Sequence, residues 1–223
     1  MDTIKKLSDY ALLVGSDIKF MGVPKTIDND LAVTDHTPGF GSAAKFIAAT
    51  MKEIIRDGLV YDYPTVTIVE IMGRNAGYLA MWCGIANGAE DVLIPEKYDY
   101  DEQKLVNHII ENRKRGKQHH IIVNAEGIGH SSSMAKRIEA ATGIETRATI
   151  LGHMQRGGSP TCKDREYAST MGALAVDLLC EGKTNRVVGY RHGDFVDYDI
   201  DEALAMKKEI PEYQYEISKN LSL

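Results

Sequence analysis

Cysteine is scarce in this sequence, and its spacing excludes the common cysteine-built sites. Only Cys83, Cys162 and Cys180 occur among 223 residues, and they form neither a CxxC pair nor an even-numbered disulfide framework. Long apolar runs are also missing, because no stretch approaches the roughly 18 residues that a membrane-spanning helix needs. No basic start followed by an apolar core marks an export signal. These absences predict a soluble, unexported protein of the reducing cytoplasm, without a membrane partner.

An excess of positive charge is lacking as well. The chain carries 26 Lys and Arg against 32 Asp and Glu, a formal net charge of −6, with both signs interspersed. This balance argues against a broad nucleic-acid-binding face, while local basic pockets for phosphate remain open. The length allows one large domain or two lobes of about 100 residues each, and either can bury a sizeable core.

The densest polar stretch runs from Gly22 to Asp30 and reads GVPKTIDND. In an extended or tightly turned backbone, Asp28 and Asp30 can face one pocket. Lys25 and Thr26 are then near enough to hold an anion beside the two carboxylates, an arrangement typical of phosphate and metal chemistry. A solvated turn is the other interpretation, because Pro, Asn and Asp are ordinary turn residues. The stretch alone does not decide between the two.

Strand and helix patterns alternate along the chain, which indicates an α/β protein. Short apolar runs predict strands, and apolar residues at three-to-four-residue spacing predict helices. Ser42 and Asp101 are candidate N-caps, while residues 211–223 show no strong pattern. The predicted strands cover residues 18–23, 66–71, 92–95, 120–125, 147–151 and 186–190, and the predicted helices 2–10, 43–58, 76–86, 102–115, 131–138, 164–180 and 200–208.

Polar residues follow two of the predicted strands. In open α/β sheets ligands bind at the carboxyl ends of the strands, so Arg74 of the run Met72-Gly73-Arg74 is a candidate phosphate clamp. The alternative is a surface arginine beside a helix start. Glu126 ends the strand over residues 120–125, where it can accept hydrogen bonds from sugar hydroxyls or cap the next helix.

A second dense cluster spans Gly152 to Pro160, with the sequence GHMQRGGSP. His153 and Arg156 lie beside paired glycines, and Arg147 precedes His153 by six residues. A solitary histidine is more often structural than catalytic. Two arginines, a histidine and glycines that allow close approach nevertheless suit a dianionic phosphate, and we favour that interpretation.

The strings PKTIDND, MGR, AEG and LGHMQRGGSP, in that order, resemble the phosphofructokinase family, which phosphorylates fructose 6-phosphate at its 1-hydroxyl. The match runs from about Gly22 to Tyr190. The resemblance implies an α/β fold of two doubly wound three-layer lobes, the first incomplete. Residues 1–41 and 154–205 would form the donor-phosphate lobe, 42–153 the fructose 6-phosphate lobe, and 206–223 a C-terminal tail.

The same resemblance implies roles for single residues in a glycolytic kinase. Asp28 looks like the catalytic base, with Thr26 and Asp30 as neighbours at the reacting phosphoryl group. Lys25 would act beside them, and Mg²⁺ would meet the developing negative charge. Arg147 matches a residue that reaches across a subunit boundary in many members, which implies a homo-oligomer in the full-length protein. Arg74 would stabilise the transferring group, and the sugar-phosphate contacts would be Met72, Gly73, Glu126, His153 and Arg156.

The phosphoryl donor depends on Lys25 in this resemblance. Lysine there is characteristic of pyrophosphate-dependent members, because its point charge favours pyrophosphate and crowds the α-phosphate of a nucleotide. Some ATP-using members also carry lysine, so pyrophosphate is the expected donor and ATP the alternative. The family's GGDG or GGDD stretch, which holds donor phosphates and metal, has no match here, so the chain resembles a fragment with its metal ligand expected upstream. A sugar-phosphate-binding fragment or regulatory subunit without catalysis is the remaining alternative.

Overall fold

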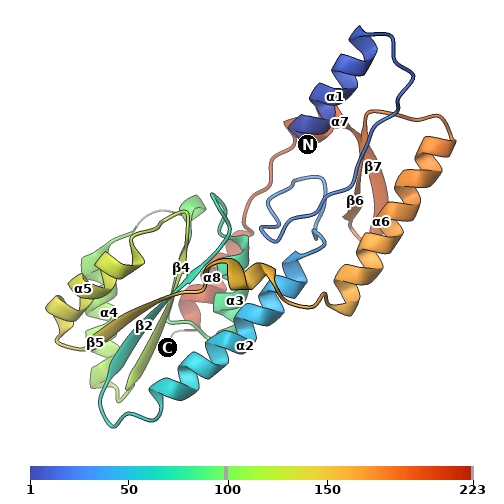
Figure 1. The fold of residues 1–223 in the computed structure, drawn as a ribbon. Helices are drawn as coiled ribbons and strands as arrows, with labels where there is room; N and C mark the ends of the chain where they lie inside the picture. The colour runs from blue at the N-terminus through green and yellow to red at the C-terminus, as the bar shows by residue number, and fades with distance from the viewer. Residues whose placement is uncertain (98–99, 222–223) are drawn as a thin grey trace. The chain divides into compact units, whose positions relative to one another are not determined.

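The computed structural model describes residues 1–97 and 100–221, and these form an α/β architecture (Figure 1). The chain divides into two compact units. Unit 1 comprises Met1–Ser42 and Ser159–Lys208, and unit 2 comprises Ala43–Gly158 and Glu209–Leu223. The chain therefore passes between the units at three points, after Ser42, after Gly158 and after Lys208.

Unit 1 is built on a three-stranded sheet with the order β1-β6-β7. Its first pair is parallel, with Met21 beside Arg186, and its second pair is an antiparallel hairpin. The elements of this unit are α1 (Asp2–Leu13), β1 (Met21–Gly22), α6 (Cys162–Cys180), β6 (Arg186–Arg191), β7 (Asp194–Asp199) and α7 (Ile200–Ala205).

Both faces of the unit 1 sheet are covered, as the two neighbouring valines of β6 show. Successive side chains of a strand point to opposite faces. Val187 accordingly packs with Ile200 of α7 and with Val33, whereas Val188 packs with Met171 of α6. The loop that contains Val33 is thus part of the core of this unit.

Unit 2 contains a four-stranded, entirely parallel sheet with the order β3-β4-β2-β5. Its two central strands, β2 and β4, are buried along most of their length, as expected for strands covered on both faces. The elements are α2 (Phe40–Gly58, whose first turn belongs to unit 1), β2 (Thr65–Ile71), α3 (Tyr78–Asn87), β3 (Asp91–Leu93), the 3₁₀ turn η1 (Pro95–Lys97), α4 (Glu102–Lys114), β4 (His119–Ala125), α5 (Ser131–Thr142), β5 (Glu145–Ile150), the 3₁₀ turn η2 (Gly152–Arg156) and α8 (Glu212–Asn220).

Helices flank the unit 2 sheet in two layers. Val66 and Ile68 of β2 and Ile122 of β4 pack against Ile109 of α4 and Ile138 of α5 in one core cluster. The helices α2 and α3 lie on the opposite side of the sheet (Figure 1). The parallel strands therefore end along a common carboxyl edge, at Ile71 in β2 and at Ala125 in β4.

The structure confirms the predicted α/β class and the cap at Asp101, whose side chain accepts hydrogen bonds from Gln103 N and Lys104 N. The cap predicted at Ser42 is wrong. Helix α2 already begins at Phe40, and the Ser42 N–H donates to the Asp164 carboxylate, so a carboxylate from another helix does the capping.

Two elements formed without a sequence prediction, β7 and α8. The strand predicted over residues 18–23 is shorter than expected, because only Met21 and Gly22 pair with β6. No helix in the described part of the chain combines the length and the apolar composition that crossing a membrane requires.

Candidate active site

The polar stretch after β1 folds into a loop whose two ends are tied together. Thr26 and Gly39 form a parallel β-bridge, and the Thr37 hydroxyl donates to the Thr26 carbonyl at 2.8 Å. Gly39 is required at this neck, because its φ of +115° is a conformation that side chains rarely adopt, and a Cβ would lie 3.3 Å from Thr26 O. We call residues 26–39 the catalytic loop, after the catalytic role predicted for Asp28.

Asn29 organises the catalytic loop from within. Its side chain is buried, and its Oδ1 accepts a hydrogen bond from Thr37 N at 2.9 Å while its Nδ2 donates to Asp35 O at 3.2 Å. Its φ of +53° is left-handed, a conformation that asparagine tolerates better than most residues. No role for Asn29 was predicted from the sequence. The signal available was an asparagine between two aspartates in a turn-rich stretch.

The three predicted residues of this loop and the preceding Lys25 differ in exposure. Asp28 and Thr26 are partly buried, and the Asp28 N–H donates to the Thr26 hydroxyl at 3.1 Å. Asp30 and Lys25 are exposed. Because Asn29 lies between the aspartates, the backbone that carries both carboxylates is fixed by a buried side chain. A carboxylate on a fixed backbone suits the general base that was predicted at Asp28.

In unit 2, three predicted residues form a turn directly after β2. The backbone N–H groups of Gly73 and Arg74 both donate to Oε1 of Glu126, the first at 3.0 Å. Arg74 has a left-handed φ of +55° and an exposed side chain. The structure thus brings Met72, Gly73, Arg74 and Glu126 together, and it gives the Glu126 carboxylate a bond to the turn that the sequence did not predict.

Gln155 links the turn after β2 to the second polar cluster. Its buried side chain accepts from Met72 N at 3.0 Å and donates to Gly152 O at 3.0 Å. The short helix η2 is thereby fastened to the turn, with His153 and Arg156 exposed on it. Gln155 is a positioning residue that was not predicted from the sequence, although it stood in the middle of the cluster.

Glycine is needed where these segments touch. A Cβ on Gly73 would lie 2.2 Å from the carbonyl oxygen of Ala76, and one on Gly127 would lie 2.6 Å from that of Arg74. Both distances are far below van der Waals contact with backbone atoms. The glycines after β2 and β4 therefore permit the close packing that holds the Arg74 turn.

Arg147 is the predicted residue that the structure does not bring to this edge. It lies on β5 opposite Thr67, four residues before the end of β2 and thus about 13 Å away along the strands. Its guanidinium pairs with Glu145 and lies 5.5 Å from the ring centroid of Tyr61. A role for Arg147 across a subunit boundary stays a prediction.

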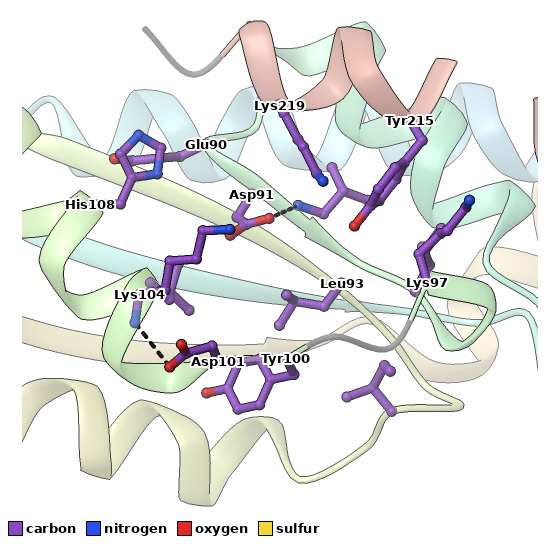
Figure 2. A pocket seen from close by; sticks show the side chains of 14 residues that line it. Glu90, Asp91, Leu93, Lys97, Tyr100, Asp101, Lys104, His108, Tyr215 and Lys219 are labelled. Carbon is purple, nitrogen blue, oxygen red and sulfur yellow. Dashed lines mark hydrogen bonds between the residues drawn. The ribbon is translucent and has the colours of Figure 1, made fainter. Parts of the chain in front are cut away.

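Unit 2 also has a cavity of about 210 Å³ beside β3 and α8. Figure 2 shows lysines and carboxylates side by side around it, among them Lys97, Lys219 and Asp91. Burial raises the pKa of the Asp91 carboxyl. None of the predicted site residues lines this cavity, and Lys97 is already paired with Glu212, so we do not assign the active site to it.

Within residues 1–97 and 100–221, no three His, Cys, Asp or Glu side chains converge in a way that could hold a metal ion. Asp28 and Asp30 accordingly belong to no such group among these residues.

Parallel strands covered by helices, with polar turns at the carboxyl edge of the sheet, define a doubly wound α/β protein. The sequence profile named Phosphofructokinase matches residues 1–179. The chain belongs to the phosphofructokinase family.

Individual relatives agree with this assignment. The ATP-dependent 6-phosphofructokinase of Clostridium botulinum is 47% identical over 211 residues, which cover 95% of this chain and 65% of that protein. A pyrophosphate-dependent phosphofructokinase from Marinobacter aquaeolei superimposes with a TM-score of 0.84 at 29% identity, over 95% of this chain and 59% of that one. The phosphofructokinase of Saccharomyces cerevisiae shares the fold, with a TM-score of 0.87 at 21% identity over 98% of this chain and 33% of that one. The chain thus spans about two thirds or less of the proteins it matches.

Proposed function

We propose that the protein is a 6-phosphofructokinase, which transfers a phosphoryl group to the 1-hydroxyl of fructose 6-phosphate and so serves glycolysis. Its family and its 47% identity to an ATP-dependent 6-phosphofructokinase support this activity. The observation that carries the proposal is the catalytic loop, where buried Asn29 fixes the backbone next to Asp28. A solvated turn would not need such an anchor.

In the proposed reaction, the Asp28 carboxylate accepts the proton of the sugar 1-hydroxyl while the hydroxyl oxygen attacks the phosphorus of the transferred group. The bond from that phosphorus to the bridging oxygen of the donor breaks, and the rest of the donor leaves with that oxygen. Thr26 and Asp30 are neighbours of the reacting group. The Arg74 guanidinium stabilises the negative charge on the transferring phosphoryl group, and the exposed His153 and Arg156 bind the phosphate of the sugar.

The remaining unit 2 residues act on the turn and on the sugar. Met72 and Gly73 shape the turn that carries Arg74, and Glu126 accepts sugar hydroxyl hydrogen bonds in addition to those from the turn. Mg²⁺ would accompany the donor phosphates and neutralise their charge. Arg147 would serve a second copy of the chain in a homo-oligomer, and the cytoplasm is the expected compartment.

We propose ATP as the donor, because the 47% identical relative is ATP-dependent. Pyrophosphate is the second candidate, favoured by Lys25 and by the pyrophosphate-dependent structural relative. The two are separated by measuring kcat/KM for each donor with the intact protein and its Lys25→Gly variant. ATP turnover that survives the substitution, with little turnover of pyrophosphate, supports ATP. Turnover with pyrophosphate alone contradicts it.

The activity itself is tested by an assay for fructose 1,6-bisphosphate with the intact protein and the variants Asp28→Ala and Asp17→Ala. Asp17 is an exposed aspartate of the same unit and serves as the control. Loss of turnover in the first variant alone supports the proposal. Calorimetry with fructose 6-phosphate separates catalysis from mere binding, because a binding module would release heat on mixing without turnover.

A further inference from the structure

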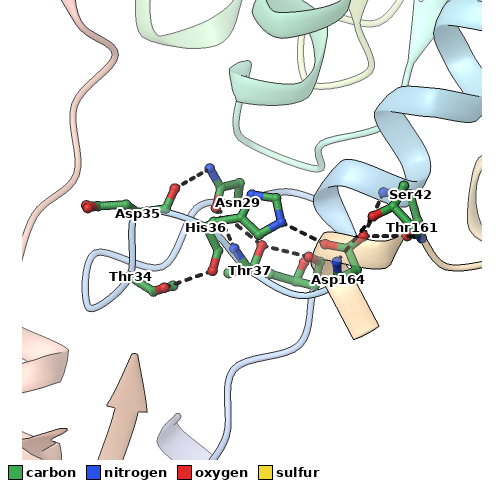
Figure 3. Close-up of polar contacts among 9 residues, drawn as sticks. Asn29, Thr34, Asp35, His36, Thr37, Ser42, Thr161 and Asp164 are labelled. Carbon is green, nitrogen blue, oxygen red and sulfur yellow. Dashed lines mark hydrogen bonds and ion pairs between the residues drawn. The ribbon is translucent and has the colours of Figure 1, made fainter. Parts of the chain in front are cut away.

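A carboxylate outside the predicted site, that of Asp164 in unit 1, is buried and accepts several hydrogen bonds. The Asp164 side chain is only 3% exposed, and its Oδ1 lies 2.7 Å from His36 Nε2. Its Oδ2 accepts from Ser42 N at 2.7 Å and from the Ser42 hydroxyl. Figure 3 shows these donors converging on Asp164. Asp164 lies outside the four sequence strings that resemble the family, and it has no role in the proposed reaction.

The position of Asp164 keeps its carboxylate charged. The residue lies in the first turn of α6, and it bonds the first turn of α2, so the partial positive charges of two helix N-termini surround it. Burial works against ionisation, but the bonds from Ser42 and His36 outweigh it and lower the pKa of Asp164. With a charged acceptor at Oδ1, His36 donates its Nε2–H.

His36 connects Asp164 to the catalytic loop, of which it is a part. Its ring is held edge-on against Phe40 and Tyr167, with centroid distances of 5.7 and 5.3 Å. The next residue, Thr37, donates its N–H to Asn29 Oδ1 at 2.9 Å. Asn29 directly follows Asp28 in the chain. A short series of buried groups therefore connects Asp164 to the backbone of the proposed base.

The hydrogen bonds around Asp164 and the catalytic loop also involve residues beside the points where the chain passes between the units. Ser42 is the last residue of unit 1 before the first crossing, and its hydroxyl accepts from Thr161 N at 3.1 Å, just after the second crossing. At the third crossing, Lys208 Nζ donates to the carbonyl of Thr34, inside the catalytic loop, at 3.0 Å. All three crossings are thus bonded to one network in unit 1.

We propose that Asp164 is a positioning residue for the reaction: its carboxylate holds the catalytic loop, through His36, to the segments by which the chain leaves and re-enters unit 1. The kinetic part of this inference rests on the proposed function. Asp164 does not touch the reacting atoms. It sets where Asp28 lies, so that a displacement of Ser42 or Thr161 would displace the base.

The first test is Asp164→Asn in the intact protein. The amide has the same size, but its nitrogen cannot accept the bonds that Ser42 or His36 donate. Because small misplacements of catalytic groups are costly, kcat should fall roughly 10- to 100-fold, while KM for fructose 6-phosphate changes less than about twofold because the sugar-phosphate contacts lie in unit 2. Asp177→Asn, at an exposed position of the same helix, should match the unmodified protein. An unchanged kcat in folded Asp164→Asn would overturn the proposal.

Hydrogen exchange tests the positioning without substrate. In Asp164→Asn the Thr37 amide, bonded to Asn29, should exchange at least about tenfold faster, while the Val69 amide in the unit 2 sheet should keep its rate. If the unmodified protein itself does not turn over fructose 6-phosphate but the Thr37 amide exchanges faster in Asp164→Asn, the proposed function fails and the positioning stands. An unchanged Thr37 rate contradicts the positioning whatever the activity.

A pair of substitutions at His36 covers the case in which Asp164→Asn does not fold. His36→Gln keeps an N–H donor of similar reach, whereas His36→Leu keeps the volume and loses the donor. The glutamine variant should retain kcat within about threefold, and the leucine variant should lose as much as is expected for Asp164→Asn. Equal activity in the two variants would show that packing alone matters and would overturn the proposal.

Discussion

The catalytic loop of unit 1 and the Arg74 turn of unit 2 are both held by side chains that bond backbone groups. They differ in whether a predicted functional residue makes these bonds. The backbone of the loop is held by two buried side chains, Asn29 within the loop and Asp164 from α6. The predicted reactive groups Asp28 and Asp30 lie on either side of Asn29 in the sequence. In the turn, the predicted substrate contact Glu126 is itself the acceptor of two backbone N–H groups.

The difference has a practical consequence for mutagenesis. We expect chemistry and structure to be separable in the loop, because Asn29 and Asp164, whose bonds hold it, differ from the predicted reactive residues Asp28 and Asp30. They are combined at Glu126, where one carboxylate stabilises the turn and is expected to meet the sugar. Substitutions in the two regions should therefore give different relations between activity and stability.

The largest expected effect comes from Asp28→Asn, which tests the separation in the loop. Removing a general base should lower kcat by about 10²- to 10⁴-fold, while the free energy of unfolding stays close to that of the unmodified protein because Asn29 still holds the backbone. Steady-state kinetics and urea unfolding measure the two quantities. A large loss of stability would show that Asp28 also holds the loop and would remove the contrast with Glu126.

Glu126→Ala should affect both quantities. Two backbone N–H groups lose their acceptor, which should cost about 1–3 kcal/mol of unfolding free energy, and KM for fructose 6-phosphate should rise. Glu126→Gln keeps one oxygen as an acceptor and should recover most of the stability. Glu139→Ala, at an exposed position of α5, is the control. Equal unfolding energies in the alanine variants would mean that the turn does not depend on Glu126.

Gly73→Ala examines the turn without changing any polar group. The new methyl would meet the Ala76 carbonyl at 2.2 Å, and we expect a loss of about 1–3 kcal/mol from the forced backbone shift. A Cβ on Gly172 of α6 would meet no neighbouring atom within 4 Å, so Gly172→Ala should instead add about 0.5–1 kcal/mol. Thermal unfolding measures both shifts, and shifts of the same sign would contradict the packing argument.

The smallest effect is a pH dependence at His36. Burial lowers the pKa of His36, and the positive charges of Lys163 and Lys208 add to this against the opposing Asp164. Neutral His36 therefore stabilises the fold fully above its unfolded pKa of about 6.5, and this contribution is lost as the pH falls through the lowered folded value. The stability difference between the unmodified protein and His36→Gln should shrink between pH 7.5 and 5. A constant difference over that range would contradict the prediction.

Most of the fold was predictable from the sequence, because strong local patterns produced it. The apolar runs of β2 and β4 and the Asp101 cap of α4 were recognisable from the residues alone. The β7 segment reads DFVDYD, with acidic residues at its first, fourth and sixth positions, which obscures the strand alternation. The helix α8 has few apolar residues to mark a buried face. Both depend on tertiary contacts rather than on local signals.

The residues of the candidate site could be proposed from the sequence, but the hydrogen bonds between them could not. Lys25, Asp28 and Arg74 stood in recognisable strings. The bond between His36 and Asp164 joins residues 128 positions apart, and no local pattern announces such a pair. Which groups a carboxylate such as Glu126 would accept from also depends on backbone positions that only the fold supplies.

The left-handed backbone at Asn29 restricts which amino acids the position can accommodate. Glycine adopts its φ of +53° freely but offers no oxygen to Thr37. Aspartate supplies the oxygen and adds a third negative charge between Asp28 and Asp30, and branched or bulky side chains are strained there. Saturation mutagenesis scored by growth should find this position among the least tolerant in the chain, although its side chain takes no part in the chemistry.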